Sequence, residues 1–395
     1  MVSEPTGKAS SSPAFPEMAQ LAKLIMKNGP EIDRIARISG QYKETIRYRY
    51  KEKILGKGFA LQARLNLEGM GLNRVIMTVR LRQSYNSYAK EVFMAMNKLC
   101  YLTSFASLMP EGTYMIQATV PKEFKDKFVD LMKRLEELGI FTSLQFYNFE
   151  WFRNVPMRAE YYDFEHGVWE FDWDKPVEYV RGDHEENGFE SFTADKVDLL
   201  IMKELQVDST RSLSEIREAI KTNDGIDINY KTLAWHWIRH VQEKRMISGY
   251  TLRWMGTRYD PISEKTQHRT HRYVVVPILV RGVSDTERMS VMSDMNKVPF
   301  IWSEAAGEDY YAQCAFPVEM VNDAFSFLKS VMAPFGERAT FHIVDQTNSV
   351  GFTLCYQLFD DVERKWRFEE EEILMRFQNL VMKIREGSGT ARNSA

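Results

Sequence analysis

Basic side chains concentrate in one segment near the start of the chain. Between Gln41 and Gly58 there are six basic and two acidic residues, a local charge of +4 within a chain of net charge −3. Lys43, Arg47 and Lys51 are spaced four apart, which places them on one face of a helix. The alternatives are an ordinary solvated face and a phosphate-binding surface, and we favour the second. The candidate DNA contacts here are Lys43, Arg47, Tyr48, Arg49, Lys51 and Lys57.

A second, weaker basic segment runs from Asn229 to Arg245 and has a local charge of +3. Trp235 and Trp237 flank His236 in this segment, and we expect one tryptophan to face the core and the other to face solvent. The candidate DNA contacts here are Lys231, His236, Arg239 and Lys244.

Histidine spacing raises the question of metal binding. His236 and His240 are four apart, as metal ligands on a helix can be, and His268 and His271 follow nearby. No carboxylate or cysteine set accompanies them at a matching spacing, so we predict no metal site. We also find no catalytic motif and expect no cofactor and no enzyme activity. The three cysteines are interpreted as buried small hydrophobes: Cys100, Cys314 and Cys355.

The elements that position these residues occur twice. Tyr114, Gln117 and Pro121 recur as Tyr310, Gln313 and Pro317, an offset of 196. Asp163, Trp169 and Phe171 recur as Asp360, Trp366 and Phe368. The sequence LIMK at Leu24–Lys27 recurs at Leu200–Lys203, and Gly58–Leu61 resembles Gly249–Leu252. We therefore predict two tandem copies of one unit.

Each copy begins with apolar residues at helical spacing, interrupted by glycine turns and followed by a strand, a pattern typical of a winged helix-turn-helix with a trailing hairpin. Strand and helix patterns then follow in the order βαββαβ, which predicts a ferredoxin-like sandwich. The expected fold class is α+β. We expect the two sandwiches to pair as a pseudo-symmetric dimer, and the acidic extensions to wrap their own units by burying Trp169 and Trp366.

The predicted domain boundaries follow from these patterns and from the charged linker between the copies. They are a disordered tail at 1–16, helix-turn-helix domains at 17–62 and 191–255, sandwiches at 63–180 and 256–348, a linker at 181–190, an extension with a C-terminal helix at 349–386, and a disordered tail at 387–395. The sequence leaves open whether the C-terminal helix packs internally or joins a second chain.

These features resemble the Lrp/AsnC (feast and famine) regulators, whose unit is a winged helix-turn-helix followed by an ACT- or RAM-like effector domain. The stretch KVDLLIMKELQVDSTRSLSEI, Lys196–Ile216, is the most similar. The chain departs from that family in having two units, a reduced Gly-x-Tyr-Asp element and an added Asp-Trp-Phe extension. The resemblance implies an archaeal source and effector-binding residues at Gly112, Tyr114, Gly307 and Tyr310, although the two tyrosines also suit a core position.

The sequence thus favours a DNA-binding transcription regulator. The expected partners are double-stranded DNA and a small-molecule effector; a membrane is not expected, and homodimerisation stays open. The expected location is the cytoplasm, at the nucleoid, because the chain has no signal peptide and no long apolar run. One alternative is an architectural DNA-binding protein. The other is a tetrapyrrole enzyme, since siroheme decarboxylases resemble Lrp-type units assembled as two unlike halves, with His268, Arg269, His271 and Arg272 as candidate residues.

Overall fold

The computed structural model of the chain describes residues 16–110, 112–175, 177, 191–254, 257–259, 266–268 and 273–392. Arg269, His271, Arg272 and the expected linker at 181–190 lie outside the described residues. In the part of the chain that the structure describes, no helix is both long and apolar enough to cross a membrane.

Three helices open the first copy. They are α1 (Pro16–Asn28), α2 (Ile32–Ser39) and α3 (Lys43–Tyr48), and α3 continues as a π-helical segment η1 (Arg49–Ile54) and a 3₁₀ turn η2 (Leu55–Lys57). Gly40 ends α2 in the left-handed conformation, with φ of 67°, which favours glycine. Ile46, Tyr50 and Ile54 are buried at a spacing of four and fix the third helix against the other two.

The second copy repeats this arrangement with α6 (Lys196–Val207), α7 (Leu213–Asp224), α8 (Tyr230–His236) and the π-helical segment η6 (Trp237–Gln242). Capping boxes begin α6 and α7, so both helix starts satisfy their free backbone N–H groups locally. Ser212, one of two expected caps, begins α7.

The first copy continues in the predicted order, β2-α4-β3-β4-α5-β5. The bounds are β2 (Leu72–Leu81), α4 (Ala89–Leu99), β3 (Leu102–Leu108), β4 (Thr113–Pro121), α5 (Lys125–Glu137) and β5 (Phe141–Tyr147). The second copy repeats it with β12 (Tyr273–Val280), α9 (Asp285–Met295), β13 (Ile301–Ala306), β14 (Tyr310–Pro317), α10 (Val321–Met332) and β15 (Ala339–Phe341). The protein is therefore a mixed α/β molecule with several sheets, compatible with the expected α+β class.

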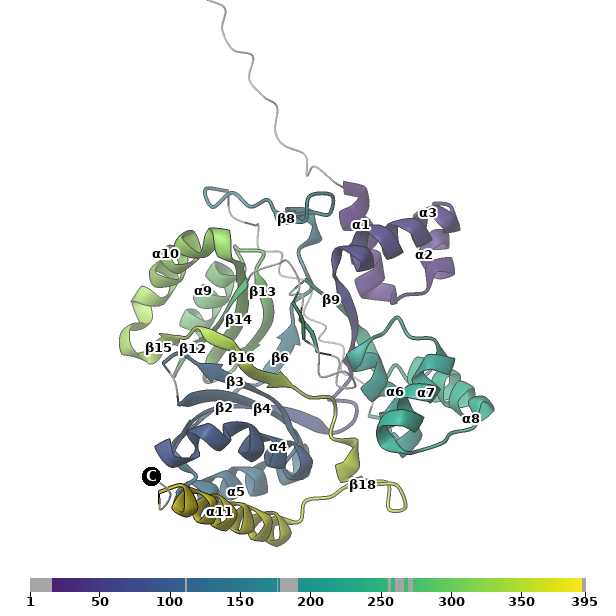
Figure 1. Cartoon of the computed structure of the whole chain (residues 1–395). Coiled ribbons are helices and arrows are strands. Elements are labelled where there is room, and N and C mark those ends of the chain that lie inside the picture. Colours follow the sequence, from purple (N-terminus) through teal and green to yellow (C-terminus); the bar gives the residue numbers. More distant parts are fainter. Residues whose placement is uncertain are drawn as a thin grey trace, which may run out of the picture.

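Each copy gives its next strand to the sheet of the other copy. The sheet orders are β16-β3-β4-β2-β5 and β15-β12-β14-β13-β6. β6 (Trp151–Asn154), from the first copy, pairs antiparallel with β13, and β16 (Val344–Gly351), from the second, pairs with β3. The two sheets lie face to face with helices on their outer sides (Figure 1), and residues such as Ile76, Leu279 and Tyr311 fill the space between them.

A two-stranded ribbon also joins the copies. β1 (Ala60–Leu65) pairs antiparallel with β9 (Ile247–Arg253), and Leu61 lies opposite Leu252. These two leucines are equivalent in the repeat, so a pseudo-twofold axis passes between them. The expected hairpin within each unit is wrong for β1, because its half-buried edge obtains its hydrogen-bonding partner from the other copy.

The acidic extensions that carry Trp169 and Trp366 also pack on the opposite copy. Trp169 is buried, but its ring packs on Phe300 of the second copy and its indole N–H donates to the Tyr273 hydroxyl. Trp366 is also buried, and packs on Tyr101 of the first copy. The expectation that each extension wraps its own unit is therefore wrong. The strand exchange carries each extension to the core of the other copy.

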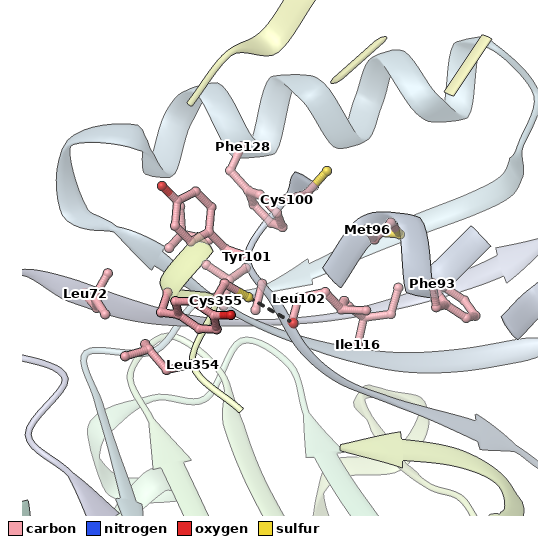
Figure 2. Close-up of a cluster of buried hydrophobic side chains, with 14 of the residues drawn as sticks. Leu72, Phe93, Met96, Cys100, Tyr101, Leu102, Ile116, Phe128, Leu354 and Cys355 are labelled. Atoms are coloured by element: carbon pink, nitrogen blue, oxygen red, sulfur yellow. Dashed lines mark hydrogen bonds between the residues drawn. The ribbon is translucent and has the colours of Figure 1, made fainter. Parts of the chain in front are cut away.

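Figure 2 shows this exchange in the hydrophobic core of the first copy. Leu354 and Cys355 of the second copy lie among Leu72, Phe128 and other side chains of the first. The Cys355 thiol donates to the main-chain oxygen of Leu102. All three cysteines are buried and free, which confirms their interpretation as core residues.

Helix α11 (Glu370–Arg392) closes the described chain. It packs on α4 and α5 of the first copy, and Arg134 of α5 donates to Glu370 over 2.7 Å. The helix bounds extend to Arg392, into the tail expected at 387–395. Three minor hairpins complete the fold: β7 (Tyr162–Asp163) with β8 (Val168–Trp169), β10 (Thr257–Tyr259) with β11 (Thr266–His268), and β17 (Phe359–Asp360) with β18 (Lys365–Trp366).

Candidate functional site: an arginine and glutamine cluster between the sheets

A cationic side chain lies on the inner face of the first sheet. Side chains alternate along β2, so Arg74 faces the same way as Ile76, which packs between the two sheets. The Arg74 guanidinium carbon lies 4.1 Å from the ring centre of Phe152 on the exchanged strand β6. One copy thus supplies both the cation and the aromatic face that it contacts.

The two glutamines that mark the repeat meet next to this arginine. The Gln117 side-chain amide donates to the Tyr311 hydroxyl over 3.2 Å, and Tyr311 in turn donates to the Gln313 side-chain oxygen over 2.8 Å. The indole N–H of Trp302 donates to the same oxygen over 3.1 Å. The pseudo-twofold relation therefore brings equivalent residues of both copies onto one hydroxyl.

A second arginine reaches this group from the ribbon. The Arg253 guanidinium carbon of β9 lies 5.2 Å from the ring centre of Trp302, and its Nη1 donates to the side-chain oxygen of Gln62. We call the set the inter-sheet arginine cluster. Its members are Gln62, Arg74, Gln117, Phe152, Arg253, Trp302, Tyr311 and Gln313.

The cluster carries positive charge without a carboxylate to balance it. Burial lowers the pKa of the Arg74 guanidinium to about 10, and burial also lowers the pKa of Arg253, because removal from water disfavours the charged form. Among the described residues, no Asp or Glu forms an ion pair with either side chain. Arg153 differs, since it lies against the buried carboxylate of Glu304. A cation that is partly removed from water in this way is unfavourable until an anion approaches it.

The chemistry of the cluster suits a flat, negatively charged ligand. Guanidinium groups bind carboxylates through paired, charge-assisted hydrogen bonds. Phe152 and Trp302 add aromatic faces, and the amides and the Tyr311 hydroxyl add neutral donors and acceptors. Burial raises the pKa of Tyr311, so its hydroxyl stays protonated at neutral pH.

The predicted DNA contacts of the first copy lie on a different surface, and three of the six have acidic partners. Lys43 pairs with Asp33, Arg47 with Glu44 and Arg49 with Glu17, at 2.6, 2.5 and 2.6 Å. The remaining predicted contacts lie close by: Tyr48 and Lys51 are exposed, and Lys57 donates to the main-chain oxygen of Glu165.

The predicted DNA contacts of the second copy lie in different environments. Lys231 is exposed, Arg239 pairs with Glu243 over 3.0 Å, and Lys244 donates to a main-chain oxygen. His236 is buried and its Nδ1 lies 2.9 Å from Asp198. Burial places this histidine away from a DNA-facing surface. Trp235 is exposed and Trp237 packs against the core, as expected.

The structure places the candidate effector residues in or beside the cores. Tyr114 is buried against Phe93, with ring centres 4.8 Å apart, and Tyr310 donates to Glu304 over 2.8 Å. Gly112 takes a φ of 92°. A side chain at Gly307 would collide with the backbone of Glu150. The effector site itself stays a prediction.

Sequence reasoning missed Arg74, Arg253 and Tyr311. A signal existed for Arg74, since an arginine inside the apolar strand LNRVIMTVRL must point its charge at one face of a sheet. The pairing of two sheets turned that face inward. No comparable signal marked Arg253, because its position depends on the ribbon between the copies.

No family model matches the chain, and no curated protein matches it. Several solved structures are similar. The crystal structure of the siroheme decarboxylase NirDL covers 92% of this chain and 99% of its own, with a TM-score of 0.51 and 9% identity. AsnC of E. coli and PH0061 each cover 35% of this chain, at TM-scores of 0.27 and 0.25 and identities of 14% and 15%. The likeness to NirDL extends over the whole fold, whereas the likeness to the AsnC-type structures is partial.

One expectation is overturned by this comparison. We expected a protein without enzyme activity, because the sequence shows no catalytic motif. The solved structure that matches nearly the whole chain is an enzyme. The basic helix is also a weaker signal than it looked, because three of its cations pair with carboxylates.

Proposed function

We propose that this protein is an enzyme that acts on a carboxylate-bearing tetrapyrrole, in the manner of a siroheme decarboxylase, and that the inter-sheet arginine cluster binds substrate carboxylates. The single observation that carries the proposal is that Arg74 and Arg253, both half-buried, have no ion-pairing Asp or Glu among the described residues. The similarity of the whole fold to NirDL supports it. A siroheme molecule offers what the cluster lacks, a rigid planar anion with several carboxylates.

The proposed reaction sets clear requirements for the site. In a decarboxylation the bond between a carbon and its carboxylate breaks, CO₂ leaves, and the electron pair that remains on carbon takes a proton. Substrate carboxylates that do not react serve as handles for orientation, and binding energy from such remote groups lowers the barrier at the reacting one. We assign this positioning role to Arg74 and Arg253.

The experiment that tests the proposal is a titration of the purified chain with the iron complex of uroporphyrin, a planar tetrapyrrole polycarboxylate, followed by the shift of its main absorption band. We expect saturable binding that weakens in Arg74→Met. Arg47→Met is the matched control, because Arg47 is an arginine on the surface with its own carboxylate partner. Equal affinity in the two variants, or no binding to the unmodified protein, would overturn the proposal.

The molecular layout belongs to the same proposal. Each copy is a winged helix-turn-helix followed by a ferredoxin-like sandwich, within the boundaries given above, and the pair derives from a duplicated Lrp/AsnC-like unit. The strand orders β3-β4-β2-β5 and β13-β14-β12-β15 support this assignment, because both place the first and third strands of the copy side by side in the centre.

A second function, binding of double-stranded DNA, is favoured by one observation. Both third helices expose an aromatic side chain among cations: Tyr48 is 58% exposed beside Lys51, and Trp235 is 52% exposed near Lys231 and Arg239. Exposed ion pairs are weak, about 0–1 kcal/mol, so phosphates can replace the carboxylate partners of Arg47 and Arg49.

Random-sequence and genomic DNA pools at two salt concentrations test this second function. We expect enrichment of a defined motif, weaker binding at the higher salt concentration, and loss of enrichment when Arg47 and Arg49 are both changed to Ala. Absence of binding even at the lower salt concentration would exclude DNA binding and leave the tetrapyrrole proposal untouched.

A further inference from the structure

Four potential metal ligands converge in the second copy, and none of them belongs to the inter-sheet arginine cluster. Asp195 and Asp198 belong to the first turn of α6, and His236 and His240 follow each other by one turn on α8 and η6. One ligand atom from each residue lies within 4.8 Å of the others. No carboxylate accompanies the two histidines at a matching spacing in the sequence, but the packing of α6 on the third helix brings two of them close.

The separations between these atoms fit a small cation. The Nδ1 atoms of His236 and His240 each lie 2.9 Å from an oxygen of Asp198. They lie 3.5 and 3.8 Å from oxygens of Asp195. Ligand atoms at about 2.0–2.1 Å from a tetrahedral ion are separated by about 3.4 Å, which falls inside this range.

The carboxylates are held in place by the helix start. One oxygen of Asp195 accepts the backbone N–H groups of Val197 and Asp198, and one oxygen of Asp198 accepts the backbone N–H of Asp195. The other oxygen of Asp198 lies 2.9 Å from Nδ1 of His236 and 3.1 Å from Nδ1 of His240, and the other oxygen of Asp195 lies 3.8 Å from Nδ1 of His240. Hydrogen bonds that orient ligating carboxylates in this way are a regular feature of metal sites.

The two carboxylates of this site favour a bound cation. The Asp198 side chain is fully buried and His236 is 10% exposed. Within the described part of the chain, the ion-pair partners of both carboxylates are these two histidines. The two carboxylates thus meet two imidazoles in a largely buried site. A divalent cation would neutralise the carboxylates.

The first copy lacks this group altogether. In the match of Leu24–Lys27 with Leu200–Lys203, Asp195 and Asp198 correspond to Ala19 and Ala22. Both alanines are buried. The same helix position is thus apolar in one copy and carries two carboxylates in the other, so the fold does not require polar residues there.

We propose that Asp195, Asp198, His236 and His240 bind one divalent transition-metal ion, with Zn²⁺ as the best match. Two imidazole nitrogens and two carboxylate oxygens in a four-coordinate arrangement suit Zn²⁺ better than Mg²⁺ or Ca²⁺, which take six or more oxygens. The ion would tie the first helix of the second copy to its third helix. This inference is independent of the proposed tetrapyrrole activity.

The test uses the full chain, stripped with a chelator, dialysed against excess Zn²⁺ and desalted. We expect about one Zn²⁺ per chain by elemental analysis, and a higher melting temperature than the stripped protein, since an ion that binds the folded state stabilises it. Co²⁺ in place of Zn²⁺ should give the intense visible absorption of a tetrahedral site.

His240→Gln removes one ligand at the more exposed histidine, and we expect it to weaken binding by at least about tenfold. His166→Gln is the matched control, because His166 also contacts a buried aspartate, Asp163, but has no second carboxylate or histidine. Metal retained equally by both variants would overturn the proposal. So would a six-coordinate Co²⁺ spectrum in the unmodified protein, a result that does not depend on whether a variant folds.

Discussion

The chain places arginines in two contrasting environments. On the third helix of the first copy, Arg47 and Arg49 are at the surface and pair with Glu44 and Glu17. Between the sheets, Arg74 and Arg253 are half-buried, and their described contacts are aromatic rings and an amide. Exposed ion pairs contribute little to the free energy of folding, and other ions can replace their partners. A cation that is partly removed from water without an anion is unfavourable, so its presence indicates a function. An arginine held between sheets without an acidic partner among the described residues is therefore the stronger sign of a bound anion.

The largest expected effect is that of Arg74→Met on ligand affinity. Hydrogen bonds to charged groups contribute about 1.5–3 kcal/mol, so we expect the affinity for iron uroporphyrin to fall about tenfold to hundredfold. The free energy of unfolding without ligand should stay the same or rise, because the change removes an unbalanced buried charge. Urea unfolding with and without ligand measures both. A strong loss of stability without ligand would mean that Arg74 has a structural role instead.

The next largest expected effect is on the free energy of unfolding, at the hydrogen bonds of the Gln117 and Gln313 side chains. Gln313→Leu leaves the Tyr311 hydroxyl and the Trp302 indole N–H without their acceptor, and we expect the free energy of unfolding to fall by about 1–3 kcal/mol. Gln117→Leu is the matched control from the other copy, since Gln117 gives a single hydrogen bond to Tyr311. Its cost should be smaller. The reverse order would contradict the network as described.

A smaller effect is expected at the surface arginines. Arg47→Ala combined with Arg49→Ala should change the free energy of unfolding by less than about 1 kcal/mol and leave tetrapyrrole affinity unchanged, because both side chains are in exposed ion pairs away from the cluster. Thermal melts and the absorption titration check this. A loss of tetrapyrrole affinity comparable to that of Arg74→Met would contradict the proposed difference between the two groups of arginines.

The smallest expected effect is on the pH dependence of stability, at the exposed ion pair of Glu287 and Arg338. Arg338 and the cap at Ser284 lower the pKa of Glu287 to about 2. The pKa is lower in the folded state than its ordinary value near 4.5, so the pair contributes stability above about pH 4.5 that is lost as the pH falls towards 2. Glu287→Gln should therefore be less stable than the unmodified protein at neutral pH and approach it near pH 2. A difference that does not depend on pH would contradict this assignment.

The sequence predicts local elements well because their signals are local. Gly40 and the Ser212 cap mark helix boundaries, and the βαββαβ order of both copies follows from short periodic runs. What it misses is the exchange between copies. The partners of β1, β6 and β16 lie roughly a hundred residues or more away, and no local pattern tells a strand which sheet it joins.

The candidate sites were missed for the same reason. Gln117 and Gln313 were visible as repeat markers, but their shared contact with Tyr311 depends on the pairing of the sheets. His236 and His240 were visible as a spaced pair, but Asp198 reaches them from a helix that begins some forty residues earlier. Residue types could be recognised in the sequence, while the distances between them come from tertiary packing.

The measurement that tests the account most directly is turnover of siroheme by the purified chain, with detection of CO₂ and of the decarboxylated product by mass spectrometry. The account predicts release of CO₂ with the unmodified protein, and a marked loss with Arg74→Met at a substrate concentration that saturates neither. Tight binding without product would contradict the enzyme proposal while retaining the binding site. Neither binding nor product would contradict the account as a whole.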